Sequence, residues 1–437
     1  MPNADGLNYA TDFQLDELTL TSSSGQQVDL RLVMRELILY EDLFANVMTG
    51  SVFISDTQDI INLLPIIGGE YLSVTLLKPS TTAKIQKTFR IYKITNRRKA
   101  SPSSEDYILH FGSEEMVLNE SILISNVYTQ MPISSIVRDI AVNVLKINSK
   151  KFPASELTHT TGNFSVTLPF WSPFYSINWL SRMARTSSTP GCSFVFFEDS
   201  EGFHFTSIEL LSQQDPIQII NFMPLHLSGQ TREKSDRSDT QQRLESAEDY
   251  ELTNAPDLLR TISTGTYASR LMRVNTLDQQ IKISTQDGTE LFNKTKHTNT
   301  NTFLQNRPDR MGINQTDRPD SYYRVAVDNL KVETWMLQRN AYMSALHGFQ
   351  LKVSLPGNMM MRVGQVATLN LPAASIGNLE KKPLDKLYSG NYLITAIQHK
   401  IDRNKYVCIL ELSKDSVEEA LPDAITGSPA VNKLRQA

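Results

Sequence analysis

Two segments near opposite ends of the chain carry the same succession of β-strand patterns, and no other feature of the sequence constrains the fold as strongly. The front copy comprises residues 69–76, 89–94 and 107–111, and the back copy comprises residues 364–371, 392–397 and 406–410. Each copy starts at a glycine and then alternates apolar with polar residues, a period of two that is typical of β-strands. A polar, helix-prone stretch follows each copy, at residues 113–117 and 413–417. The pattern indicates a duplicated β-unit, although two unrelated antiparallel sheets also give alternating strands with glycine starts.

The length and composition predict a multidomain globular protein. The chain has 437 residues, more than a single domain usually contains. Its 40% hydrophobic and 21% charged residues are ordinary values for a globular protein. A net charge of −4 argues against a nucleic-acid-binding protein, which needs a basic surface, but leaves room for a local basic patch.

The cysteines and the N-terminus predict a soluble protein made in a reducing cytoplasm. Cys192 and Cys408 lie far apart in apolar strand patterns, as expected of buried free thiols rather than of a disulfide or a metal site. Residues 1–20 have neither the positive flank nor the apolar core of a signal peptide. The longest apolar stretch, residues 60–67, is too short to span a bilayer.

The predicted fold class is α+β, mainly β, with two similar antiparallel β-barrels and a smaller α/β domain between them. Helical periodicity is confined mainly to residues 134–147, 172–186 and 332–346. Between the second and third of these, residues 191–205 predict a β-hairpin with its turn at 199–202.

These patterns divide the chain into five regions. They are a first barrel (1–113), an α/β domain (114–228), a second barrel (229–286 and 328–420), a polar insertion loop (287–327) and a flexible tail (421–437). The insertion lacks the apolar residues that a core requires, so we expect a long loop or a partly disordered arm there.

The sequence contains none of the common catalytic motifs. The nucleophile elbow, the zinc-binding HExxH, the phosphate loop and the dinucleotide-binding GxGxxG are absent, and no histidine stands at ligand spacing from another histidine or cysteine. The carboxylate pairs 114–115 and 418–419 are adjacent in sequence, so their side chains diverge instead of flanking one bond. His110 and His399 lie in strand patterns and are interpreted as structural. We therefore expect no catalytic, cofactor-binding or metal-binding residues, no cofactor and no enzymatic activity.

Three consecutive methionines, Met359, Met360 and Met361, are the candidate subunit-contact residues. If they lie on a strand, alternate side chains face opposite ways, so at least one faces a neighbour, a second layer or solvent. Methionine suits adaptable contact surfaces. The alternative is that both faces are covered within the same chain.

An aromatic cluster at residues 170–179 also has two interpretations. At this spacing, aromatic side chains are expected to form the small core beneath the hairpin 191–205. An aromatic binding surface is the alternative.

The order of these motifs resembles that of phage baseplate hub proteins, a family related to the hub part of type VI secretion spikes. Residues 177–205 resemble the second domain of that family, residues 50–56 and 69–70 its first barrel, and residues 356–365, 389–395 and 410–412 its second barrel. The layout looks most like the T-even-type central hub of long contractile tails, over about residues 20–412.

The resemblance implies a virion structural protein of the tail baseplate, made in the host cytoplasm. It implies a homotrimer whose two barrels per chain form a pseudo-sixfold ring between the sixfold tail tube and the threefold cell-puncturing spike. The implied partners are the other two copies, the central spike protein and a tail tube or tube-initiator protein, with the tape measure protein as a further candidate and DNA only in transit during injection. Two other functions stay open: a cell-wall hydrolase carrying β-rich binding modules, and a carbohydrate- or nucleic-acid-binding barrel pair. A related injection device is also compatible with the resemblance.

Overall fold

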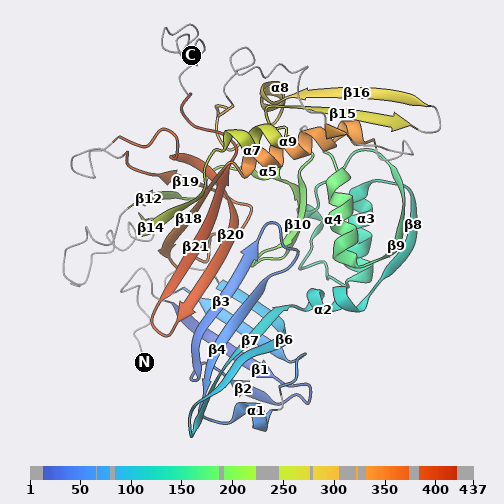
Figure 1. Ribbon diagram of the computed structural model, residues 1–437. Helices are drawn as coiled ribbons and strands as arrows, with labels where there is room; N and C mark the ends of the chain where they lie inside the picture. Colours follow the sequence, from blue (N-terminus) through green and yellow to red (C-terminus); the bar gives the residue numbers. More distant parts are fainter. Residues whose placement is uncertain are drawn as a thin grey trace.

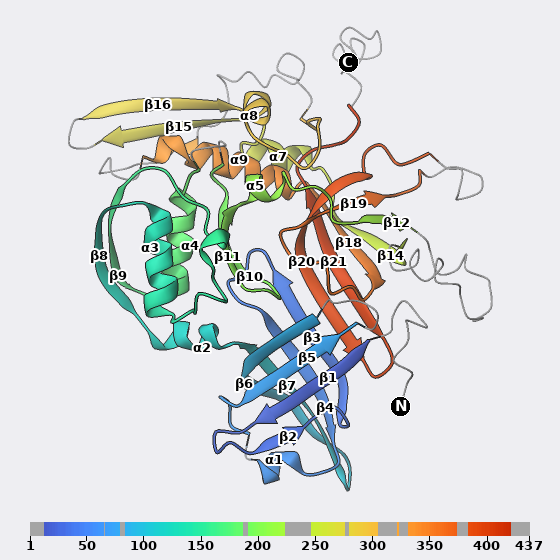
Figure 2. The same cartoon turned by 180° about the vertical axis from the view of Figure 1, so that it is seen from behind.

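One continuous set of hydrogen-bonded strands contains both the N-terminal (front) and the C-terminal (back) copy of the β-unit. The computed structural model describes residues 13–64, 66–78, 84–186, 191–222, 246–275, 279–304, 321–322, 331–373 and 383–420. In these ranges strands predominate over helices, which confirms the α+β, mainly β class. No closed barrel is found there, so the predicted pair of barrels is not confirmed. Figures 1 and 2 show the front strands in blue to cyan at the bottom, the red strands β20 and β21 of the back half above them, and a cyan and green lobe beside both.

Seven strands form the front sheet. They are β1 (Gln14–Thr21), β2 (Gln27–Asp29), β3 (Met34–Asp42), β4 (Thr49–Asp56), β5 (Tyr71–Leu77), β6 (Lys84–Ser101) and β7 (Ser104–Ser113), with the short helix α1 (Ile60–Leu63) between β4 and β5. Their order in space is β3–β4–β7–β6–β5–β1–β2, and all neighbours are antiparallel. Alternate residues of each strand face the core, as Val52 and Ile54 do on β4.

The back sheet also has seven strands. They are β12 (Ile219–Phe222), β13 (Ser246–Ala247), β14 (Asp249–Asn254), β18 (Phe349–Pro356), β19 (Val366–Asn370), β20 (Gly390–Asp402) and β21 (Tyr406–Lys414). Their order is β14–β18–β21–β20–β19–β12–β13, antiparallel except that β12 is parallel to both of its neighbours. When the strands of each sheet are numbered one to seven along the chain, both sheets have the same spatial order, 3–4–7–6–5–1–2.

The two glycines that open the sequence repeats occupy equivalent positions. Gly69 and Gly364 have φ of +97° and +83°, a region that favours glycine. Gly69 N donates to Ile91 O (2.6 Å), and Gly364 N donates to Ile394 O (2.9 Å). The registers of β6 and β20 then shift immediately after these isoleucines. The same turn, hydrogen bond and bulge therefore recur in the two halves, as expected of a duplicated unit.

The third strands match with a small offset from the sequence pattern. Ile91 pairs with Phe111 and Ile394 pairs with Leu412, so Phe111 corresponds to Leu412. If the two sequence patterns are instead aligned at their first residues, 107 and 406, Phe111 corresponds to Leu410. Only the pairing partners reveal this offset, because period-two patterns match equally well after a shift of two residues.

The two sheets are joined by one strand pair. Residues 36–42 of β3 pair antiparallel with residues 396–402 of β20. The earlier part of β20, residues 390–393, pairs with β19. The edge of β20 is thus shared between its own sheet and the front sheet.

The lobe between the halves contains helices and short hairpins. Its elements are α2 (Glu114–Ser121), β8 (Ile124–Met131), α3 (Ile133–Asp139) continued by a π-helical turn (Ile140–Val144), a 3₁₀ turn (Ala154–Glu156), β9 (Phe164–Trp171), α4 (Pro173–Met183), β10 (Phe194–Glu198), β11 (Phe203–Ser207) and α5 (Ile208–Leu211). The predicted helices at 134–147 and 172–186 and the predicted hairpin are confirmed. The lobe has a core of its own, to which Ile136, Ile177 and Phe196 belong, while Phe197 of β10 and Ile208 of α5 pack into the core of the sheets.

The aromatic cluster at 170–179 divides between core and surface. Phe174 is buried in the lobe core, whereas Phe170 is 71% exposed and Tyr175 is 55% exposed. The core interpretation therefore holds for only part of the cluster.

The remaining elements lie against the lobe and the back sheet. They are α7 (Leu258–Ser263), β15 (Ala268–Asn275), β16 (Gln280–Asp287), α8 (Gly288–Lys294), β17 (Ser321–Tyr322), a 3₁₀ turn (Val332–Thr334) and α9 (Met336–Leu346). Residues 287–304 of the expected polar loop contain α8, because Asp287 caps it by accepting hydrogen bonds from Thr289 N and Glu290 N. Residues 321–322 of the same loop form β17. Residues 305–320 and 323–327 of that loop, and the expected tail 421–437, lie outside the described residues.

The helix expected at 413–417 is wrong. β21 continues to Lys414, and Val417 forms an isolated bridge with Asn301. By contrast, the helix-prone stretch that begins at residue 113 in the front copy leads into α2.

We predict that Gly69→Ala and Gly364→Ala each lower the free energy of unfolding by about 1–2 kcal/mol, because alanine is strained at these φ values. Gly112→Ala is the control: its φ is not in that region, and an added Cβ is crowded only by the flexible end of Met116, with Met48 O at an ordinary contact distance of 3.6 Å. It should cost under about 1 kcal/mol. Urea unfolding measures all three variants. A loss for Gly112→Ala as large as the other two, or a clear loss at only one of Gly69 and Gly364, would contradict the equivalence of the two glycine turns.

Candidate functional site

The junction of β3 with β20 is the candidate functional site, because it is where the two copies of the β-unit meet. Seven residue pairs form its backbone ladder. At its exposed face, Lys400 Nζ lies 2.9 Å from Glu36 Oε1.

Four polar side chains are buried behind this ladder. Glu41 comes from β3 of the front sheet, while His399, Tyr406 and Cys408 come from the back sheet, and each is at most 1% exposed. His399 Nδ1 lies 2.8 Å from Tyr406 Oη and 3.4 Å from Cys408 Sγ, and its Nε2 lies 3.7 Å from Glu41 Oε1. Glu41 Oε2 accepts a hydrogen bond from Val363 N at 3.4 Å.

The chemistry of this group favours an ion pair across the junction. Burial acts to lower the pKa of His399, but Cys408 and Glu41 outweigh it and raise that pKa to about 10. These contacts favour the charged form of the imidazole, whose Nε2 faces the side chain of Glu41 on the other sheet. Acid, histidine and thiol stand in a row, as in some hydrolases, but none of the three side chains is exposed to a substrate.

A second set of contacts joins the lobe to the back sheet. His204 lies between two carboxylates, with Nδ1 2.7 Å from Glu156 Oε2 and Nε2 3.0 Å from Asp199 Oδ1. Asp199 Oδ2 in turn lies 3.4 Å from Arg362 Nη1, and Arg362 also pairs with Glu201. Burial acts to lower the pKa of His204, but the two carboxylates outweigh it and hold the pKa above its usual 6.5.

The three methionines lie beside Arg362, on a turn between β18 and β19 rather than on a strand. Met359 and Met361 are buried in the sheet core, and Met360 is 57% exposed. Subunit contact stays a prediction, and Met360 is the methionine whose side chain is free to make it.

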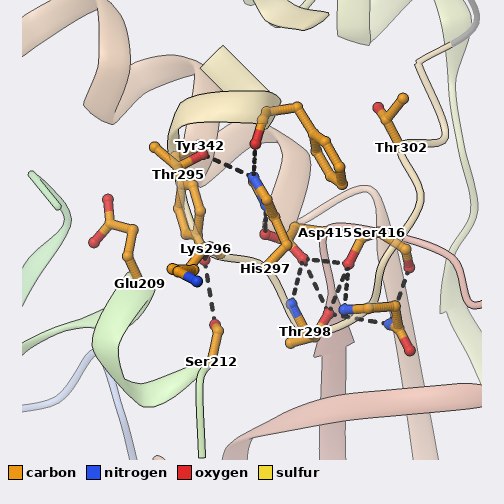
Figure 3. A network of polar contacts seen from close by, with 12 residues as sticks. Glu209, Ser212, Thr295, Lys296, His297, Thr298, Thr302, Tyr342, Asp415 and Ser416 are labelled. Carbon is orange, nitrogen blue, oxygen red and sulfur yellow. Dashed lines mark hydrogen bonds and ion pairs between the residues drawn. The ribbon is translucent and has the colours of Figure 1, made fainter. Parts of the chain in front are cut away.

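Figure 3 shows a third polar cluster, at the end of β21, which the sequence interpretation missed. The fully buried carboxylate of Asp415 accepts hydrogen bonds from Thr298 N (3.2 Å) and Thr298 Oγ1 (2.9 Å), and its Oδ2 lies 2.5 Å from His297 Nδ1. His297 Nε2 lies 2.7 Å from Thr295 Oγ1. Burial acts to raise the pKa of Asp415, but His297 and these donors hold it below its usual value. The cluster fastens residues 295–298 to the back sheet.

The side chains of the adjacent carboxylates 114 and 115 have different partners. Glu115 pairs with Lys151 at 2.7 Å, whereas Glu114 accepts from Tyr71 Oη at 3.3 Å, so the adjacent pair diverges as predicted. In the described ranges, no three His, Cys, Asp or Glu side chains are placed to hold a metal ion. Both cysteines are buried and free, as predicted. Over the same described part of the chain, no helix has the length and apolar character needed to cross a membrane.

Comparisons with known proteins agree with the predicted resemblance. No protein-family model matches the chain. A probable baseplate hub protein, gp334 of Vibrio phage KVP40, is 22% identical over 416 residues, covering 89% of this chain and 91% of that protein. The resemblance to baseplate hub proteins is confirmed.

Two solved tail proteins share the fold. The 43 kDa tail protein of prophage MuSo2 from Shewanella oneidensis has a TM-score of 0.55 at 8% identity, covering 92% of this chain and 99% of its own. A tail protein from Neisseria meningitidis MC58 has a TM-score of 0.52 at 11% identity, covering 91% and 96%. The shared fold therefore extends over both sheets and the lobe. A cell-wall hydrolase finds no support in these comparisons.

We predict that Glu41→Gln lowers the free energy of unfolding by about 3 kcal/mol, because it leaves a buried imidazolium without its carboxylate. Glu36→Gln, on the same strand, is the matched control. It removes a partly exposed ion pair and should cost under about 1 kcal/mol. Chemical unfolding of the two variants gives the comparison, and a small loss for Glu41→Gln would rule out the buried ion pair.

We also predict a histidine-dependent loss of stability at alkaline pH. Since the pKa of His204 is raised in the folded state, its stabilising contribution is complete below about pH 6.5 and is lost as pH rises through the raised pKa. Between about pH 6 and about pH 9, the wild type should lose more unfolding free energy than His204→Gln. His159→Gln, at an exposed histidine, should keep the wild-type slope. Parallel curves for the wild type and His204→Gln would contradict the prediction.

Proposed function

We propose that this chain, a relative of baseplate hub proteins, is the structural hub of a contractile phage tail. Three copies form a ring with pseudo-sixfold symmetry, which adapts the sixfold tail tube to the threefold cell-puncturing spike. One observation carries the proposal: two halves with the same strand order lie side by side in a single sheet. Three such chains present six similar units around one axis.

Pairing at the end of the back sheet supports its proposed barrel form. Residue Ser246 pairs with Asn221 of β12, and two residues later Glu248 N donates to Ser354 O of β18 at 2.8 Å. Residues 246–254 thus reach from one end of the back sheet to the other. We propose that both halves curl in this way and leave few exposed sheet edges in the ring.

The proposed partners follow from that position in the tail. They are the other two copies, the central spike protein, a tail tube or tube-initiator protein and the tape measure protein, in the virion baseplate. The net charge of −4 per chain suits a lumen through which DNA passes without being held, because like charges repel. The protein acts without catalysis, and the division into two barrels, an α/β domain and an insertion is part of this proposal.

The mass of the purified chain in solution, alone and with a spike protein, tests the function. We expect a homotrimer that binds the spike protein as a trimer. A chain that stays monomeric over a concentration series and does not bind a spike protein would contradict the hub. Muralytic activity of such a monomer would favour the hydrolase instead.

A further inference from the structure

The junction inside the chain is a template for a junction between chains. β3 of the front sheet and β14 of the back sheet are equivalent strands. Each is the third strand of its sheet along the chain and lies at one end of that sheet's strand order. β3 pairs with the back sheet's β20 along residues 396–402. If six similar units form a ring, the strand equivalent to β3 must pair with the strand equivalent to β20. Those strands are β14 and β6.

The required edges are available. β5 pairs with residues 84–90 of β6, and within the described residues no strand pairs with residues 92–100 on that side. β14 likewise pairs in the described ranges with β18 on one side only. A strand edge with unpaired amides and carbonyls is a ready template for another strand.

Exposure of β14 also indicates a missing neighbour. Through their pairing with Gly50 and Leu351, Leu39 of β3 corresponds to Leu252 of β14, and Leu37 therefore corresponds to Tyr250. Leu37 and Leu39 are fully buried beside β20, whereas Tyr250 and Leu252 are each 40% exposed. A further strand paired with the open edge of β14 would help to bury the side chains of Tyr250 and Leu252.

The charges of the two edges are complementary and follow the template. Lys400 pairs with Val407, and Arg98 pairs with the equivalent Asp106, so Arg98 stands in the place of Lys400. By the same counting, Asp249 stands in the place of Glu36. The ion pair Lys400–Glu36 of the internal junction thus maps onto Arg98 and Asp249.

Neighbouring residues extend this complementarity. The β6 edge also carries Lys93, Arg97 and Lys99, while the β14 strand carries Glu251 and follows Glu248. Arg97 and Arg98 contact Glu105 and Asp106 of β7, at 2.8 and 3.4 Å, which neutralises part of the basic edge. Four basic residues against these two carboxylates still leave the edge positive.

We infer that β14 of one chain pairs antiparallel with residues 93–100 of β6 in the next chain, so that a second copy of this protein completes the open edge of the front sheet. The contact runs head to tail and closes after three chains, since each chain spans two of six equivalent positions. The inference rests on the proposed trimer and names the strands that hold it together.

A disulfide tests the register. In the template Lys400 stands opposite Ile38, which places Arg98 opposite Glu251 across the interface. The double variant Arg98→Cys/Glu251→Cys should form disulfides between chains on mild oxidation and give dimers and trimers on a denaturing gel. Lys84→Cys/Glu251→Cys, at the other end of β6, should stay monomeric on the gel, as should each single variant. A trimer in solution without cross-links would overturn the strand pairing while leaving the hub intact.

Charge exchange gives an independent readout that does not depend on cysteine chemistry. Arg98→Glu/Lys99→Glu should dissociate the trimer into folded monomers, and so should Asp249→Lys/Glu251→Lys. Combining all four changes should restore the trimer, since the charges are exchanged rather than lost. Circular dichroism checks that each variant is folded. Trimers that persist in both half-exchanged variants would refute the inference, whereas a wild type that is itself monomeric would refute the proposed function.

Discussion

The arrangement of the molecule depends on the antiparallel pairing of β3 with β20. This pairing converts two sheets of equal strand order into one continuous surface. The backbone hydrogen bonds between β3 and β20 fix the direction and register of the two strands. The buried contact of Glu41 with His399 makes any other register less stable, because a shift of one strand along the other would leave a buried charge unpaired. The two copies are therefore held at one relative rotation, which is the geometric requirement for a closed ring.

In the described residues, the lobe between the sheets is attached by buried ion pairs and by apolar packing rather than by strand pairing, and Phe197 of β10 and Ile208 of α5 belong to the sheet core. The buried carboxylate of Glu198 binds the front sheet through Lys87 at 3.0 Å and through Met48 N, also at 3.0 Å. On the other side, Asp199 contacts Arg362 of the back half. Two adjacent residues at one end of the hairpin β10–β11 thus contact both halves, which couples the position of the lobe to their relative rotation.

Local patterns in the sequence predicted much of the fold. Period-two strands, the repeated glycines Gly69 and Gly364 and the amphipathic stripes of α3 and α4 all depend on neighbouring residues. The buried ion pairs escaped prediction, because Glu41 and His399, or His297 and Asp415, lie far apart in sequence and look like ordinary polar positions. The polar run at 298–302 is likewise predicted to lie in a long loop or a partly disordered arm, although Thr298 donates two hydrogen bonds to a buried carboxylate.

A structure of the assembled ring at side-chain resolution would show directly how the chains are arranged. We expect three chains whose front and back halves alternate about one axis, with β14 of each chain beside β6 of the next. Halves stacked along the axis, or a ring closed through other strands, would contradict this expectation.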